Sequence, residues 1–158
     1  MAKMKQEGRE PYFRPHNEKT PLTKRRLALI QLEQSLRLLE EGDPVSALTL
    51  AGAAEEILGA IAKRKGHEPR VSYEADWMGS LFDSAHKPRP LKRQLIAMLN
   101  RSRNHLKHQD DGRNIRVTAN WYYEAENMLL RCMFNYFDAF GRYPASKPLR
   151  EWFENMTL

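Results

Sequence analysis

Cysteine and long apolar runs are both scarce in this sequence, and each scarcity excludes a class of protein. The 158 residues contain one cysteine, Cys132, so neither an intramolecular disulfide framework nor a multi-cysteine zinc site can form. No apolar run approaches the ~20 residues of a membrane span, and residues 1–10 lack the apolar stretch of a secretory signal. We therefore expect a cytoplasmic protein with no membrane partner.

The common catalytic signatures are missing as well. The chain has no Gly-rich phosphate loop, no G-x-G-x-x-G, no H-E-x-x-H and no G-x-S-x-G. The adjacent acids Glu55 and Glu56 lack the Glu-x-x-His companions that di-iron sites in helical bundles use. We expect no metal and no cofactor.

Helical periodicity and capping signals run through the chain, whereas no stretch alternates long enough to predict a strand. The predicted main helices cover residues 21–41, 43–65, 90–108 and 118–140, and short helices are predicted near 76–85 and after 146. The fold class is therefore all-α, a bundle of four main helices with short additional helices. Residues 1–20 are expected to form a flexible arm, and residues 21–158 a single helical domain.

Several residues have predicted roles within these helices. Thr20 and Thr118 are the expected N-caps of the first and fourth main helices. The short helix is expected to plug the core with Trp77, Leu81 and Phe82. The fourth main helix is apolar on nearly every side, which is typical of a helix central to a bundle or shared with another subunit.

The second main helix is rich in small residues, which allow neighbouring backbones to approach closely. Glu55 lies near its apolar stripe and, if buried, needs a partner of opposite charge. Glu56 is expected on the solvated face.

The net charge of +6 is concentrated in one segment. Residues 91–117 contain seven basic residues and only two acids. The basic residues are Lys92, Arg93, Arg101, Arg103, Lys107, Arg113 and Arg116. Such a cluster is typical of a polyanion site, because phosphates release counterions when they bind clustered cations. It is equally typical of a solvated helix face.

The sequence RSRNHLKH, residues 101–108, concentrates groups suited to phosphate chemistry. On an ideal helix one face, away from the apolar stripe, carries Arg101, Asn104, His105 and His108. Arg103 projects elsewhere and joins them only if the helix unwinds near its end. Basic residues in a last helical turn are also favoured by the helix dipole alone.

Arg103-Asn104-x-x-x-His108 resembles the R-x(4–6)-H signature of the HEPN superfamily (higher eukaryotes and prokaryotes nucleotide-binding). Arg101 to His108 fits the six-residue version of the signature. Residues 51–58, with their small side chains and acidic pair, are similar to an early helix of these proteins. The likeness covers residues 22–140.

The resemblance implies a homodimer in which two motifs face each other across a cleft. It also implies metal-independent RNA cleavage, as in toxin–antitoxin or antiviral defence systems, with an antitoxin or another protein as partner. His108 would move protons to and from the ribose, Arg103 would hold the phosphate, and Asn104 would orient either group. The supporting residues would be Arg101, His105, Lys107 and Glu55. This chemistry leaves a 2′,3′-cyclic phosphate.

An interpretation from another class remains open. The chain would then be a non-catalytic helical dimer that acts as an adaptor or as a nucleotide-binding module. Arg103 and His108 would in that case cap a helix or bind acidic groups of a partner.

Overall fold

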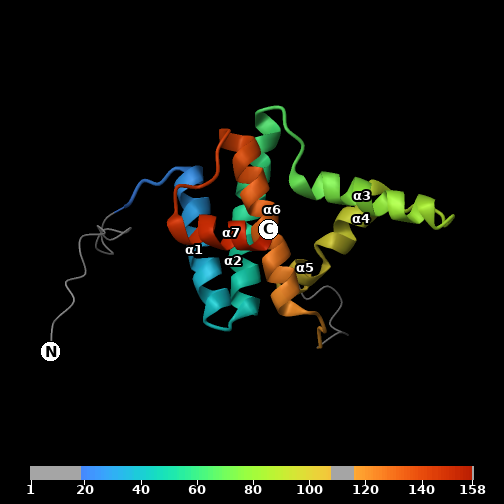
Figure 1. The fold of residues 1–158 in the computed structure, drawn as a ribbon, viewed down its shortest axis with the longest axis horizontal. Helices are drawn as coiled ribbons and strands as arrows, with labels where there is room; N and C mark the ends of the chain where they lie inside the picture. Colours follow the sequence, from blue (N-terminus) through green and yellow to red (C-terminus); the bar gives the residue numbers. More distant parts are fainter. Residues whose placement is uncertain (1–18, 108–115, 158) are drawn as a thin grey trace.

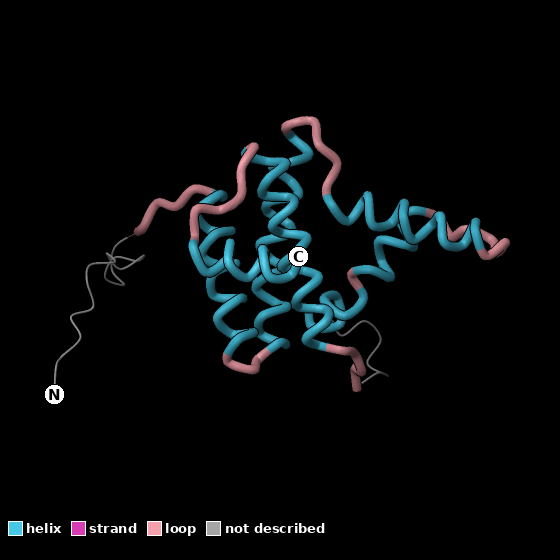
Figure 2. Tube along the Cα trace, in the orientation of Figure 1, coloured by secondary structure: helices cyan, strands magenta, loops and turns pink. Residues whose placement is uncertain are grey.

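Helices account for all the regular structure in the part of the chain that this computed structural model describes, residues 19–107 and 116–157 (Figures 1 and 2). The helices are α1 (Lys24–Glu40), α2 (Pro44–Arg64), α3 (Arg70–Ser84), α4 (Lys92–Leu99), α5 (Arg101–Lys107), α6 (Trp121–Phe140) and α7 (Lys147–Thr157). The prediction of an all-α fold is confirmed. The expected arm lies outside the described residues, apart from Lys19 and Thr20.

Three long helices, α1, α2 and α6, form the body of the molecule, with α7 packed against it (Figure 1). Their shared core is built from fully buried side chains, among them Leu32, Leu36, Leu48, Leu58, Leu129, Met133 and Tyr136. The all-round apolar character of α6 is thus explained by its central place in the bundle, where it packs against α2 along much of its length. Gly141 ends α6 in the left-handed conformation at φ 67°, which glycine adopts without strain.

The small residues of α2 serve this packing. Ala47, Ala51, Ala54 and Ala62 are fully buried, so α1 and α6 can approach the α2 backbone. Among the described residues, α2 alone is long and apolar enough to cross a membrane by length and composition. Half of its apolar stretch is buried inside the fold, as in the core helix of a globular bundle.

A hairpin of α3 and α4 projects from the side of this body (Figure 1). The expected short helix at 76–85 is corrected to a longer one that begins at Arg70, where the backbone N–H donates to Asn135 Oδ1 at 2.7 Å. The expected core plugs are also wrong in place, since none of Trp77, Leu81 and the half-buried Phe82 packs in the hydrophobic core. Trp77 is 65% exposed and Leu81 48%, because the hairpin turns these side chains away from the three-helix core.

The expected continuous helix at 90–108 is interrupted at Asn100, which separates α4 from α5. Asn100 has φ −102° and ψ 6°, and its Oδ1 accepts a hydrogen bond from Nη1 of the buried Arg131 at 2.7 Å. This long-range bond holds the chain at the break. It is invisible to a helical pattern.

Two predicted caps are corrected by a few residues. Thr23 caps α1 in place of Thr20, because its Oγ1 accepts from the backbone N–H of Arg26 at 3.1 Å. Asn120 caps α6 in place of Thr118 and accepts from the N–H of Tyr123 at 3.2 Å. Asparagine is at least as good a cap as threonine, and α1 and α6 each begin directly after the residue that caps them.

Candidate functional site

Arg103 lies on α5 with its side chain buried against α2. Only 9% of the residue is exposed, and its aliphatic stem crosses α2 at Gly52. A Cβ at position 52 would lie 2.5 Å from Arg103 Cδ and 2.9 Å from Cγ. The glycine in the small-residue stretch therefore makes room for one particular side chain, which fixes α5 against α2.

The Arg103 guanidinium reaches a pair of carboxylates on α2. Its Nη1 lies 3.2 Å from Glu55 Oε2 and 3.4 Å from Glu56 Oε1. Its Nη2 lies 3.5 Å from Asn104 Oδ1. The Nε is buried and has no hydrogen-bond partner among the described residues. Arg103 is thus held from one side by carboxylates, and its Nε donor is unused.

Glu55 is buried, with 5% exposure, and has the partner that its position predicts. Asn135 Nδ2 of α6 donates to its second oxygen at 3.4 Å. Burial raises the pKa of the Glu55 carboxyl, against the opposing effect of the Arg131 and Arg103 charges. This carboxylate therefore joins α2, α5 and α6 at one point.

Glu56 behaves differently because it is exposed at the rim of the same interface. Lys107 Nζ lies 2.7 Å from Glu56 Oε1, and this hydrogen bond lowers the pKa of the Glu56 carboxyl. Lys107 and Arg103 therefore share one acid, and both hold α5 to α2.

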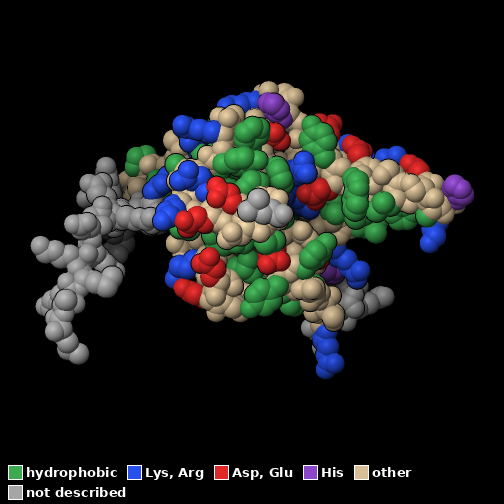
Figure 3. Space-filling view, viewed as in Figure 1, with side chains coloured by type: hydrophobic (Ala, Val, Ile, Leu, Met, Phe, Trp, Pro, Cys, Tyr) green, Lys and Arg blue, Asp and Glu red, His purple; other side chains and the backbone are tan. Residues whose placement is uncertain are grey.

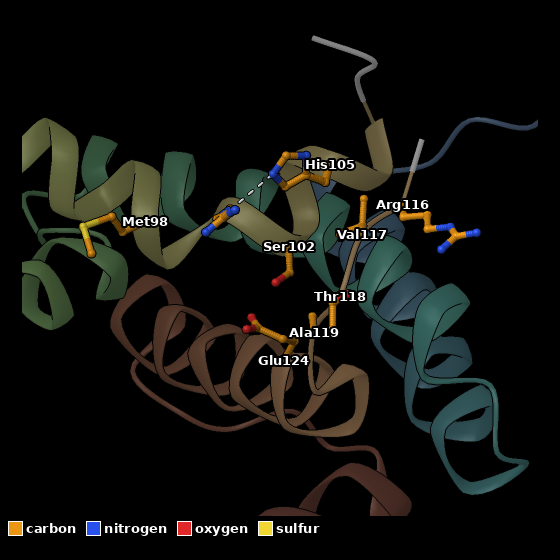
Figure 4. Close-up of a pocket in the computed structure, with 9 residues that line it drawn as sticks. Met98, Ser102, His105, Arg116, Val117, Thr118, Ala119 and Glu124 are labelled. Carbon is orange, nitrogen blue, oxygen red and sulfur yellow. Dashed lines mark hydrogen bonds between the residues drawn. The ribbon is translucent and has the colours of Figure 1, made fainter. Parts of the chain in front are cut away.

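The opposite face of α5 opens onto a pocket of about 330 Å³ (Figure 4). Arg101 Nε donates to His105 Nε2 at 3.4 Å, and this contact brings the two side chains together at the pocket. Figure 4 shows the Ser102 hydroxyl and the Glu124 carboxylate pointing toward each other across the pocket. The wall is completed by Met98, Arg116, Val117, Thr118 and Ala119.

The α5 segment thus divides its predicted site residues between two faces. Arg103, Lys107 and Glu55 meet at α2, and Asn104 lies beside Arg103. Arg101 and His105 meet at the pocket. His108 lies outside the described residues.

A second polar network was missed by sequence reasoning. Arg131 is 3% exposed, and its guanidinium contacts Glu74 Oε2 with Nη2 at 2.6 Å and with Nε at 3.1 Å. The same group donates to Asn100. A signal was present, since Arg131 and Asn135 are polar residues within the apolar stretch of α6, and buried polar residues require partners.

No group of three or more His, Cys, Asp or Glu side chains suited to a metal ion occurs within residues 19–107 and 116–157. The chain matches no known family model, no curated protein sequence and no solved structure.

Proposed function

We propose that this chain is a HEPN-like RNA-binding protein of the cytoplasm that cleaves RNA without a metal, with α5 as its active segment. The observation that carries the proposal is that the two faces of α5 carry different groups of polar residues. One face is anchored to α2 by Arg103 and Lys107, while the other presents Arg101 and His105 to a pocket. Anchoring one face keeps the other in a fixed position, which is what catalysis by positioned groups requires.

Two kinds of group in the pocket support the binding and cleavage of a phosphodiester. Arg101 and Arg116 line it, and guanidinium groups bind phosphate oxygens with paired donors. A neutral imidazole can accept the proton of a ribose 2′-hydroxyl. The 2′-oxygen then attacks the adjacent phosphorus, the 5′-oxygen of the next nucleotide leaves with a proton, and a 2′,3′-cyclic phosphate remains.

Two histidines compete for the role of base. His105 lies in the pocket with Arg101, whereas His108 completes the R-x(4)-H motif with Arg103 and Asn104. In the second arrangement Arg103, whose Nη1 is paired with Glu55 and Glu56 and whose Nε is buried, would have to turn away from α2 to contact the phosphate.

The test is cleavage of a structured RNA in excess EDTA, followed by analysis of the product ends. Wild type is compared with His105→Ala, His108→Ala and Arg101→Gln, and with His67→Ala as a control, since His67 lies in an exposed loop. We expect cyclic phosphate ends from wild type and the control, and loss of cleavage in Arg101→Gln and one of the two active-segment histidine variants. Unchanged cleavage in both of those histidine variants would overturn the mechanism.

A groove beside the hairpin favours a second candidate, a non-catalytic helical adaptor or nucleotide-binding module. The groove of about 500 Å³ lies between the hairpin and α6. Its lining includes Trp77, Met98 and Tyr123, exposed by 65%, 54% and 60%. In this candidate a second copy of the chain or another protein, such as an antitoxin, covers the groove. Thermal unfolding with a panel of nucleotides and with candidate protein partners tests it, because a ligand of the native state raises the melting temperature.

A further inference from the structure

One end of the three-helix body brings together the beginning of α1 and the ends of α2 and α6 (Figure 1). Two cations flank the same ring there. The Arg25 Cζ lies 4.8 Å from the centroid of Phe140, and the Lys65 Nζ lies 4.9 Å from it. Arg25 Nε also donates to the Tyr136 hydroxyl at 2.8 Å, and Lys65 Nζ donates to the carbonyl of Ala139. These contacts fix the three helix ends against one another.

Further basic residues surround this pair. We call the whole group the basic end; it consists of Lys24, Arg25, Lys63, Arg64, Lys65 and Arg142. All but Arg25 are exposed. Lys24, Lys63, Arg64 and Arg142 have no ion-pair partner within 4.0 Å among the residues that the structure describes. Figure 3 shows Lys and Arg side chains gathered over this part of the body.

The segment with the largest charge excess in the sequence is, by contrast, partly neutralised by the fold. Lys92 pairs with Asp76 and Glu68 of the hairpin region. Arg103 and Lys107 pair with the acids of α2. Residues 21–90 sum to zero charge, yet folding places Glu40, Glu41 and Asp43 at the other end of α1 and α2. The basic end is therefore created by the topology.

We propose that the basic end binds the phosphate backbone of single-stranded RNA, as a surface separate from the candidate site on α5. This inference rests on the proposed function in one respect, the choice of RNA as the polyanion. The candidate site lies near the beginning of α6 and the basic end at its finish. A 20-residue helix is about 30 Å long at 1.5 Å per residue, so one RNA strand would contact both.

Helix dipoles do not account for so many cations. The carboxyl ends of α2 and α6 lie here, and each carries about −0.5 of a charge. Together they offset about one of the six cations in the group, while the beginning of α1 adds a positive end.

A membrane surface fits this end less well than RNA does. Binding to an anionic bilayer through an interfacial helix needs exposed apolar side chains beside the cations. The rings of Tyr136 and Phe140 are instead covered by Arg25 and Lys65. Among the described residues, Phe137, 43% exposed, is the one large exposed apolar side chain near the end of α6, whereas Tyr73, Trp77 and Leu81 lie on the hairpin.

The test compares two variants that each lose one lysine and one arginine. Lys63→Gln with Arg64→Gln removes two charges from the basic end. Lys87→Gln with Arg150→Gln removes two exposed charges, one from the hairpin and one from α7, and neither side chain has an ion pair within 4.0 Å among the described residues. Affinity for a labelled oligouridylate long enough to span α6 is measured from about 50 to about 200 mM salt. Each lost phosphate contact with a single strand makes the slope of log K against log salt less steep by about 0.7. We therefore expect the slope to become less steep by about 1.4 in the Lys63/Arg64 variant and to stay unchanged in the other variant.

The outcomes separate this inference from the proposed function. A reduced slope in the Lys63/Arg64 variant alone supports it, even if His105→Ala and His108→Ala leave cleavage unchanged. Equal slopes in both variants overturn it, even if cleavage depends on those histidines. It is also overturned if the Lys63/Arg64 substitutions weaken binding to phosphatidylserine vesicles and leave RNA binding unchanged, because the partner would then be a lipid surface.

Discussion

Gly52 allows α5 to pack against α2, because the Cβ atom that any other residue would add here would meet the Arg103 side chain. Glycine inside a helix is normally less favourable than alanine by about 1 kcal/mol, so Gly52→Ala would ordinarily stabilise α2. Here the added Cβ would meet Arg103 Cδ at 2.5 Å, and the buried arginine would have to leave Glu55. We expect a net loss of about 1–3 kcal/mol, as for other overpacked sites, measured by urea unfolding.

Gly59 offers a matched control in the same helix. A Cβ at this position would meet Pro69 Cβ at 3.4 Å and Asn135 Nδ2 at 3.5 Å, which are ordinary contacts. Gly59→Ala is therefore expected to be neutral or to stabilise the protein by up to about 1 kcal/mol. Equal changes in the free energy of unfolding for Gly52→Ala and Gly59→Ala would show that the packing of Arg103 does not require a glycine at position 52.

Glu56 should give the α2–α5 interface a dependence on pH. Its pKa is lowered from 4.5, mainly by the hydrogen bond from Lys107. The native state thus binds this proton less tightly than the unfolded state, so the stabilisation is complete above pH 4.5 and is lost as pH falls through the lowered pKa. We expect Glu56→Gln to cost about 0.5 kcal/mol at neutral pH and less in acid.

Thermal unfolding across the acid range measures this difference, with Glu154→Gln as a control at an exposed acid. A cost of Glu56→Gln that stays constant with pH would contradict the assignment. The contribution of Glu55 to stability changes with pH in the opposite direction. Burial raises its pKa, so its own contribution to stability falls as pH rises above 4.5.

The helices themselves are the part of the fold that could be predicted from sequence. The cap followed by proline, Asp43 and Pro44, begins α2 as expected. Asp43 Oδ1 accepts a hydrogen bond from the backbone N–H of Ser46 at 3.0 Å. The break at Asn100 could not be predicted, because it depends on Arg131, which is 31 residues away. Periodicity describes one helix at a time and carries no information about a side chain arriving from another.

That break supplies a prediction about the elements around it. Asn100→Ala removes the acceptor for Arg131 Nη1, and a buried donor left without a partner costs about 1–3 kcal/mol. We expect the melting temperature to fall by about 2–4 °C per kcal/mol, with faster amide exchange in α3, α4 and α5 than in wild type. Amides of α1 and α2 should be protected as before. Asn155→Ala, at an exposed position of α7, is the control. Slower exchange across the break in Asn100→Ala would instead indicate that α4 and α5 join into one helix.

Charge at the scale of the whole molecule was the least predictable feature of the candidate site. The basic segment at 91–117 is a property of local sequence, but Glu55, Glu56 and Asp76 reach its cations from distant helices. Sequence reasoning could state that a buried Glu55 needs a partner, since that follows from burial alone. It could not name Arg103 as the partner, because the choice depends on how α5 crosses α2.

The exposed aromatic groove leads to a prediction about assembly. Trp77 is 65% exposed on the hairpin, and burying such a side chain stabilises an interface by about 1.5–3 kcal/mol. If the proposed homodimer covers the groove, Trp77→Gln should raise its dissociation constant about tenfold or more without changing the melting temperature of the monomer. Sedimentation equilibrium measures the constant, with Tyr122→Gln, 49% exposed at the beginning of α6, as the control. A dimer weakened by Tyr122→Gln alone would place the interface on another face, and a wild type that stays monomeric would leave the groove to a partner of a different kind.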